Sequence, residues 1–442
     1  MGAASLSPFA AAICGLLILL IPFAYAGLAL MNSGLGRSRS AVHSLMASLT
    51  VIGVASLAYV ICGSAFEGFP GRAAFALSAA GRSWNWIGSG RLFFGGLDFD
   101  SGSGAALAAC FGMFAAALAA VIPLGAGEER WRLGSAAIST AVLAGWTYPL
   151  FAHWVWGGGW LAELGAPAGR GAGFGVGFVD AGGAGAIQVV GGLSALSVTW
   201  LMGPRRGKFS ADGMPTAIPG HNAVFVTFGA FLALIGWVGL NSSAAILFYG
   251  AAPSRIALIA VNTALSAGSA LLAAALVTRT RFGKPDASLS ANGWTAGLAA
   301  SSAGAAFQVP AEALMVGLIA GALVTLSVEW LELHLKIDDP GGSISVHAVG
   351  GLWGLIAAGF LGRFPGGSLG TPSEGQWMAQ LTGVATLVGF MFPMIYGLNW
   401  TLDRISRFRV ALDGERQGMD LHELGANAYP ELVSHLEDVS QR

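Results

Sequence analysis

Two polar side chains stand at matching positions of a repeated segment, and their types suit the handling of a proton or a small cation. Residues 180–196 read DAGGAGAIQVVGGLSAL and residues 339–355 read DPGGSISVHAVGGLWGL, with 8 of 17 positions identical. Gln188 in the first copy corresponds to His347 in the second. A neutral imidazole accepts a proton near physiological pH, whereas an amide offers an acceptor and two donors but does not titrate. The pattern therefore predicts a two-part polar site of which only one part can carry a proton.

Each copy also opens with an aspartate and contains a pair of glycines. Asp180 and Asp339 stand where a side chain can cap the exposed amides of a helix start, so we expect both to give structural support. The pairs at 191–192 and 350–351 remove the side chains that would keep neighbouring helices apart. The repeat thus has the features of two helices that pack closely against each other.

The composition indicates that these helices lie in a membrane. Hydrophobic residues make up 55% of the 442 residues and charged residues only 10%, against about 25% charged residues in a soluble domain. We therefore expect an all-α polytopic membrane protein with eleven transmembrane helices. The apolar stretches of spanning length, about 20 residues each, are 9–31, 43–65, 105–126, 134–156, 180–202, 221–247, 256–279, 291–307, 312–333, 343–362 and 378–403.

Basic residues predict the orientation of the chain. With the N-terminus outside, the cytoplasmic segments would hold sixteen of the 22 Lys and Arg residues and the outer segments six. This distribution favours an outer N-terminus and a cytosolic C-terminus in the cytoplasmic (inner) membrane. We therefore expect residues 1–403 to form the transmembrane domain and 404–442, the one strongly polar region, to form a cytosolic tail.

The spacing of the repeat predicts an inverted architecture. The copies begin the fifth and tenth spans, so each repeat holds five spans and the two enter the membrane from opposite faces, with an eleventh helix after them. Gln188 and His347 each lie eight residues after their aspartate, which is about 12 Å of helix. In a core about 30 Å thick, both side chains then lie near the midplane, where transport folds with such repeats place their sites.

The sequence contains none of the enzyme motifs that would favour an intramembrane hydrolase. The chain contains neither a Gly-x-Ser-x-Gly elbow nor a His-Glu-x-x-His zinc motif. Cys14, Cys62 and Cys110 lie in apolar runs and favour neither a disulfide framework nor a zinc site. We expect no cofactor and no metal, and the net charge of −1 gives no reason to expect a nucleic-acid partner.

Several short motifs follow one another in a fixed order along nearly the whole chain. They include AHWVWGGG at 152–159, IPGHN at 218–222, GWVGLN at 236–241, GKPD at 283–286, IDDP at 337–340 and GMD at 418–420. In these motifs and their spacing the chain resembles the ammonium transporter family (Amt/Mep/Rh), on the Amt side. The resemblance implies a homotrimer with one hydrophobic pore in each subunit, which conducts ammonium or its neutral form, and methylammonium as an analogue. It also implies that the tail is regulatory and meets a PII-type signal protein.

The resemblance assigns pore positions, and this chain departs from the family pattern at several of them. His347 matches one of two midplane histidines, and Gln188 stands where the other is expected. Trp156 matches the tryptophan of the outer ammonium-recruitment site, but a serine of that site falls on Ala244. One of two gating phenylalanines falls on Leu240.

The second gate position is ambiguous. The resemblance counts Phe111 and Phe114 with the outer ammonium-recruitment site. They are separated by three residues, where the family separates its aromatic residues by four, so the gate falls on Phe114 or on Ala115. Trp237 belongs to the expected pore lining, and the resemblance gives Asp180 an electrostatic role beneath the outer site. Taken together, the departures predict a weakened site for recruiting cations above a pore that is still apolar.

Two alternatives compete with this interpretation. Gln188 and His347 could merely join two helices by a hydrogen bond, and the aromatic residues could be ordinary packing. The protein could also be an ammonium-binding sensor or low-flux receptor of the same fold, which Gln188, Ala244 and Leu240 favour. The sequence to residue 442 contains no kinase or cyclase and its tail follows the transporter pattern, so we expect transport.

Overall fold

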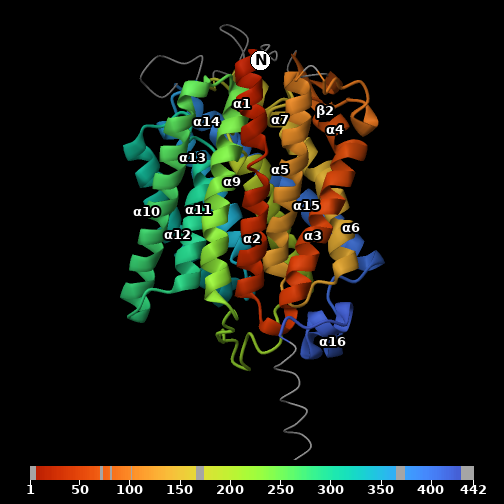
Figure 1. The fold of residues 1–442 in the computed structure, drawn as a ribbon, viewed down its shortest axis with the longest axis vertical. Coiled ribbons are helices and arrows are strands. Elements are labelled where there is room, and N and C mark those ends of the chain that lie inside the picture. Colours follow the sequence, from red (N-terminus) through yellow and green to blue (C-terminus); the bar gives the residue numbers. More distant parts are fainter. Residues whose placement is uncertain are drawn as a thin grey trace, which may run out of the picture.

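The computed structural model describes residues 6–69, 73–79, 82–100, 102–165, 174–364 and 374–429. These residues form a bundle of helices that run side by side along the long axis of the molecule (Figure 1). Nine helical stretches in the described part of the chain are long and apolar enough to cross a membrane. They are Pro8–Leu35, Ser38–Glu67, Gly104–Gly127, Ala184–Met202, Ala223–Tyr249, Pro253–Phe282, Pro310–Leu335, Ile344–Leu361 and Gln376–Ile405.

Two more helical stretches bring the bundle to the eleven expected from the sequence. One consists of α6 (Leu133–Val142), a π-helical turn η4 (Leu143–Thr147) and α7 (Tyr148–Val155), and the other is α11 (Ala287–Ser301). The 15 residues of α11 extend about 22 Å, less than the thickness of a bilayer core. The predicted span 291–307 is wrong at its end, because the chain leaves the helix after Ser301 and continues in turns.

Several stretches are divided into shorter elements by prolines or π-helical turns. The remaining helices are α1 (Pro8–Ile18), α2 (Pro22–Leu35), α3 (Ala41–Ala58), α4 (Ser64–Glu67), α5 (Gly104–Gly127), α8 (Val190–Met202), α9 (Ala223–Tyr249), α10 (Ile256–Phe282), α12 (Pro310–Leu335), α13 (Gly350–Leu361), α14 (Gln376–Thr386), α15 (Phe392–Ile405) and α16 (Leu412–Gln417).

The two copies of the repeated segment pack against each other inside the bundle. A methyl group added at Gly192 would lie 2.4 Å from the backbone nitrogen of Ala348, and one added at Gly351 would lie 2.8 Å from the carbonyl oxygen of Ala184. Such distances are shorter than van der Waals contact, so only glycine permits this approach at either position. The predicted contact between the two helices is confirmed, and it depends on one glycine of each pair.

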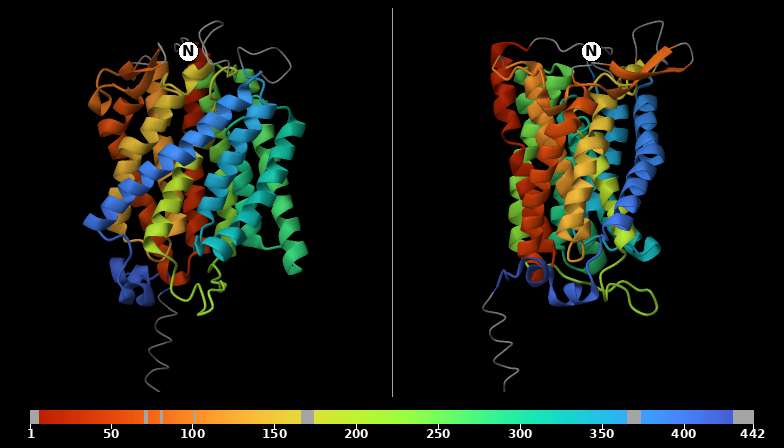
Figure 2. Two further views of the ribbon diagram at one scale, coloured as in Figure 1. Left: turned by 180° about the vertical axis from the view of Figure 1, so that it is seen from behind. Right: turned by 90° about the vertical axis from the view of Figure 1, so that its right-hand side faces the viewer.

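A β-hairpin that the sequence analysis did not predict lies at the end of the bundle that holds the N-terminus (Figure 2). Its strands are β1 (Ala73–Ala79) and β2 (Arg82–Gly88), paired antiparallel. The indole N–H of Trp154 donates a 2.7 Å hydrogen bond to the carbonyl of Trp86, whose ring lies 4.9 Å from that of Trp154. These contacts hold β2 against the end of α7.

The tail lies at the opposite end of the bundle, where α16 and a π-helical turn η10 (Asp420–Leu424) pack below α3 and α6 (Figure 1). The Asp420 carboxylate accepts hydrogen bonds from the backbone amides of Val42 and His43 at 3.2 and 2.7 Å, at the start of α3. Glu423 accepts one from the backbone amide of Leu133 at 2.8 Å, at the start of α6. Acidic side chains of the tail thus cap two helices of the bundle. Residues 430–442 of the predicted tail lie outside the described residues.

Candidate functional site

The two helices that carry the polar pair begin in the same way. Each opens with a π-helical turn, η6 (Ala184–Val189) or η8 (Ile344–Val349), an element that is frequent at functional sites. The Asp180 carboxylate accepts hydrogen bonds from two backbone amides of η6 at 2.8 and 2.9 Å. Asp339 accepts two at the start of η8, at 3.0 and 2.7 Å. The predicted helix start at residue 180 is wrong, because this aspartate caps from outside a helix that begins at Ala184.

Gln188 and His347 meet where these two turns cross. The Nδ1 atom of His347 lies 2.8 Å from the Oε1 atom of Gln188, and the two residues are 3% and 0% exposed. An amide oxygen only accepts, so Nδ1 carries the hydrogen and Nε2 keeps its lone pair. The Nε2 atom of Gln188 has no hydrogen-bond partner among the described residues. The pair therefore presents one basic nitrogen and one unused N–H donor in a buried setting.

Helix α9 supplies the wall beside this pair. The indole of Trp237 lies 6.5 Å from the His347 ring, at an interplanar angle of 27°. Its N–H donates to the hydroxyl of Ser302 at 3.2 Å. Leu240 and Ala244 follow on the same side of α9, three and seven residues further toward the hairpin end, and both are fully buried. These residues therefore lie along α9 between Trp237 and an aromatic cluster around Trp156 at the hairpin end of the bundle.

That cluster contains a residue which the sequence analysis missed. The ring of Phe248 stacks on Trp156, with centroids 4.6 Å apart and an interplanar angle of 6°. Phe111 approaches the same indole edge-on at 5.7 Å, and the indole N–H donates to the carbonyl of Asp180 at 2.9 Å. Trp156 is consequently 6% exposed, and one of its faces is covered by Phe248. The signal that could have identified Phe248 is its position in the sequence, because it lies one helical turn after Ala244 on α9.

The gate candidates differ in burial. Ala115 is fully buried on α5, one turn after the buried Phe111, whereas Phe114 is only partly buried. At the hairpin end of the bundle, the ring of Phe69 packs edge-on against Phe248 at 5.3 Å. Aromatic side chains from three segments thus form one connected set of ring contacts that includes Trp156.

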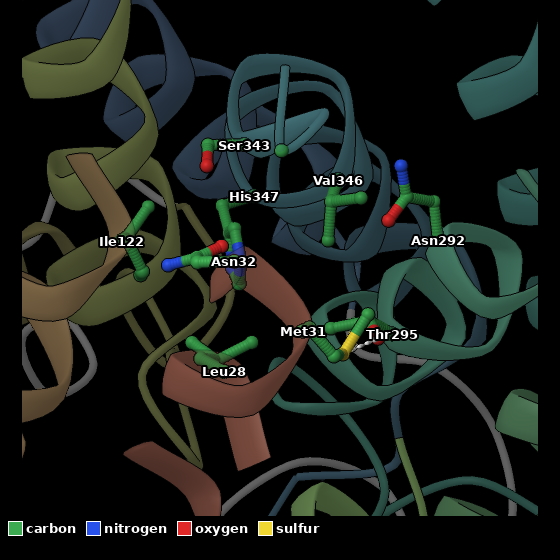
Figure 3. Close-up of a pocket in the computed structure, with 10 residues that line it drawn as sticks. Leu28, Met31, Asn32, Ile122, Asn292, Thr295, Ser343, Val346 and His347 are labelled. Carbon is green, nitrogen blue, oxygen red and sulfur yellow. Dashed lines mark hydrogen bonds between the residues drawn. The ribbon is translucent and has the colours of Figure 1, made fainter. Parts of the chain in front are cut away.

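A small cavity lies beside His347 (Figure 3). Its volume is about 10 Å³, which is room for one water molecule. The sequence analysis missed its polar lining, although Asn32, Asn292 and Ser343 are polar residues at spans that are otherwise apolar, which is a signal of function in a membrane protein. The cavity is lined by Leu28, Met31, Asn32, Ile122, Asn292, Thr295, Gly341, Ser343, Val346 and His347.

A buried ion-pair cluster fixes the chain just before η8. The Asp338 carboxylate accepts hydrogen bonds from the Arg205 guanidinium at 2.9 and 3.0 Å, and Arg130 lies 3.8 Å away. Burial acts against the charged form, but Arg130 and Arg205 outweigh it and lower the pKa of Asp338 to about 2. Asp338 therefore stays charged throughout the physiological range and holds this end of the bundle together.

Comparisons with known proteins agree with this geometry. The model of the Ammonium Transporter Family matches residues 12–429. Ammonium transporter Amt2 of Archaeoglobus fulgidus is 35% identical over 438 residues, which cover 96% of this chain and 88% of that protein. An ammonium transporter of Bacillus subtilis is 28% identical, covering 94% and 96% of the two chains.

Solved structures show the same fold. One described as "Sensor Amt Protein" has a TM-score of 0.81 at 26% identity and covers 94% of this chain and 98% of its own. Mep2 of Candida albicans has a TM-score of 0.76 at 22% identity, with 95% and 90% covered. These likenesses confirm the predicted all-α membrane fold. By its match to the family model and to relatives over nearly its full length, the chain belongs to the Ammonium Transporter Family, whose members are transporters and not enzymes.

Proposed function

We propose that this chain transports ammonium across the membrane, along a path through its own helix bundle that passes Gln188 and His347, and that it does so slowly. The observation that carries this proposal is the 2.8 Å contact between the two side chains at the crossing of the repeats. The relatives named above are themselves ammonium transporters. Because Gln188 cannot titrate, we assign the slow rate to this position.

The chemistry of the pair explains why the rate is low. A bare ammonium ion is expensive to bury in an apolar core, so the ion must lose a proton or find acceptors. The Nε2 atom of His347 can take a proton from ammonium, which leaves neutral ammonia and an imidazolium. The unused N–H of Gln188 can then donate to the lone pair of ammonia. The proton on His347, however, has no second titratable group to move to within the pair, so it returns by the same nitrogen or leaves through water.

The structure also favours a second candidate, a sensor or low-flux receptor. Phe248 covers one face of Trp156, and a solved structure similar to this chain is described as a sensor Amt protein. A flux measurement separates the two functions. In proteoliposomes, uptake of neutral ammonia raises the internal pH, and uptake of the ion appears as current. Transport requires one of these signals above the level of protein-free liposomes, and a pure receptor gives neither.

The outer aromatic cluster gives a first prediction. Phe248→Ala uncovers the face of Trp156, where a cation–π contact contributes about 0.5–2 kcal/mol, so the ammonium concentration at half-saturation should fall severalfold. Trp156→Ala should raise it, and Ala244→Ser, which supplies a hydroxyl, should lower it. Half-saturation of flux in proteoliposomes measures all three. If none of the variants changes it, ammonium is recruited elsewhere and the proposed outer site is wrong.

The tail gives a second prediction. Asp420→Ala removes the cap of α3, a loss of about 1 kcal/mol, and should make the tail about fivefold more sensitive to limited proteolysis while the bundle still inserts. Asp413→Ala, at an exposed position of α16, is the matched control and should leave the cleavage rate unchanged. Equal cleavage rates in both point variants would show that capping does not hold the tail.

Truncation after Phe408 should change the response of the flux to cytosolic nitrogen status.

Orientation and assembly belong to the same proposal. We propose that the protein lies in the cytoplasmic (inner) membrane with its tail in the cytosol, because the basic residues gather at the tail end of the bundle. Protease added outside intact cells should then leave the tail uncut. The homotrimer and the PII-type partner rest on the family resemblance alone. A native mass measurement that finds only monomers would contradict the trimer, and a tail that binds no PII protein would contradict the partner.

A further inference from the structure

A second, larger cavity lies at the end of the bundle that holds the β-hairpin and α4 (Figure 1). Its volume is about 300 Å³, at the lower end of the range of about 300–1,000 Å³ that small-molecule sites occupy. Its walls come from α4, the first turns of α5 and the loop between β2 and α5. It shares no lining residue with the cavity beside His347, so it is a separate space.

A carboxyl group in the lining of this cavity has no cationic partner. Glu67 is 1% exposed, and its Oε2 atom accepts a hydrogen bond from the Tyr59 hydroxyl at 2.6 Å. Its Oε1 atom has no hydrogen-bond partner among the described residues, and neither has the Oγ atom of Ser64, which also lines the cavity. No ion pair with Glu67 forms in that part of the chain, although glutamate is almost never fully buried unless it is paired. Because an unpaired buried acceptor is costly, these two groups indicate a ligand with N–H donors and a positive charge.

A cation in the same lining also lacks an ion pair within the described ranges. Arg91 is exposed and lines the cavity. A methyl group at Gly96 would lie 3.3 Å from its Nη1 atom, so the guanidinium lies against the loop that forms this wall. Asp98, the remaining charged residue of the lining, accepts a hydrogen bond from the backbone amide of Asp100 at 3.0 Å. A guanidinium matches the planar geometry of a carboxylate, so Arg91 indicates a ligand that also has a negative group.

Much of the remaining lining is apolar, and part of its backbone is strained. The ring of Phe94 lies 6.2 Å from that of Tyr59, and Phe69 and Leu97 belong to the same lining. Phe93 and Phe94 have φ angles of 56° and 54°, which is a rare conformation for a bulky residue. Strained residues of this kind cluster at sites that clamp a ligand. The cavity can therefore hold an apolar group beside its charged residues.

We propose that this cavity binds an α-amino acid with an apolar side chain. The ammonium group of the ligand donates to Glu67 and Ser64, and its carboxylate binds Arg91. A simple amine would leave Arg91 without a partner, and a simple carboxylic acid would leave the buried carboxyl group without one. None of the residues proposed for the ammonium path lines this cavity, so the inference goes beyond the proposed function and does not depend on it.

The test is calorimetric titration of L-leucine into the full chain in nanodiscs. Two analogues keep the carbon skeleton and remove one charged group each: isoamylamine lacks the carboxylate, and isocaproate lacks the amine. We expect each analogue to bind at least about tenfold more weakly than L-leucine, as the loss of a hydrogen bond between charged groups does. Equal affinities for all three compounds would contradict recognition of both ends.

Variants assign the two ends of the ligand to their residues. Arg91→Gln should weaken L-leucine about tenfold and leave the affinity for isoamylamine unchanged, because that amine has no carboxylate to lose. Glu67→Gln should weaken both L-leucine and isoamylamine about tenfold. Arg255→Gln is the matched control, because it removes the same charge from an exposed arginine outside the lining, and its affinities should not change.

The exposed position of Arg91 keeps the test decisive if Glu67→Gln fails to fold. Its replacement changes a side chain in a loop and leaves the buried contact between Glu67 and Tyr59 in place. Absence of L-leucine binding to the unaltered chain would overturn the inference. An Arg91→Gln protein that binds L-leucine as tightly as the unaltered chain would overturn it as well.

Discussion

Replacing Gln188 with histidine should raise ammonium-driven charge movement about tenfold or more. The substitution puts a second titratable ring at the position whose amide oxygen now lies 2.8 Å from the Nδ1 atom of His347, so a proton taken from ammonium can pass between two rings. Positioned acid–base groups accelerate reactions about 10²–10⁴-fold, and we expect a smaller effect because one acceptor is already present. Current on solid-supported membranes at matched protein density measures the change.

The control for this prediction removes the hydrogen bond without adding a proton carrier. Gln188→Leu leaves His347 without its partner and should not raise the current. If Gln188→Leu raises it as much as Gln188→His does, the glutamine only obstructs the path. A Gln188→His protein with wild-type current would show that proton transfer at the midplane does not limit the rate.

His347→Ala should reduce whatever ammonium flux the protein has by about 10²-fold, or change its selectivity between ammonium and methylammonium. The substitution removes the only titratable side chain of the pair and one of the residues that line the adjacent cavity. Internal pH and current in proteoliposomes report the loss for the neutral and the charged species separately.

His347→Gln separates proton chemistry from helix packing. An amide at this position can still hydrogen-bond to Gln188 and join the two helices, but it cannot carry a proton. We expect its flux to be as low as that of His347→Ala. Wild-type flux in His347→Gln would mean that the pair serves only to hold the helices together.

The repeat allowed the central contact to be predicted from the sequence. The spacing between the copies, the matching aspartates and the glycine pairs indicated two helices that touch, and the structure brings Gln188 to His347. The hydropathy of the sequence predicted the spanning helices and the approximate positions of most of their ends. These signals succeed because a buried polar residue and a glycine at a helix contact are rare choices in an apolar segment.

Other features depend on tertiary packing and left weaker signals. The π-helical turns η6 and η8 result from a change of hydrogen-bond pattern that no single residue specifies. The stacking of Phe248 on Trp156 joins two helices far apart in sequence, and aromatic residues are common in every apolar span. The cavity beside His347 is lined by residues from segments far apart in the sequence, so Asn32, Asn292 and Ser343 share one space only when the fold brings them together.

The most direct test of the midplane mechanism is the charge moved per protein after an ammonium pulse, in wild-type membranes of known protein density. We expect a small, slow signal that depends on His347, because the proton on its ring has no second titratable group in Gln188 to receive it. A fast wild-type current that His347→Ala leaves intact would contradict the mechanism.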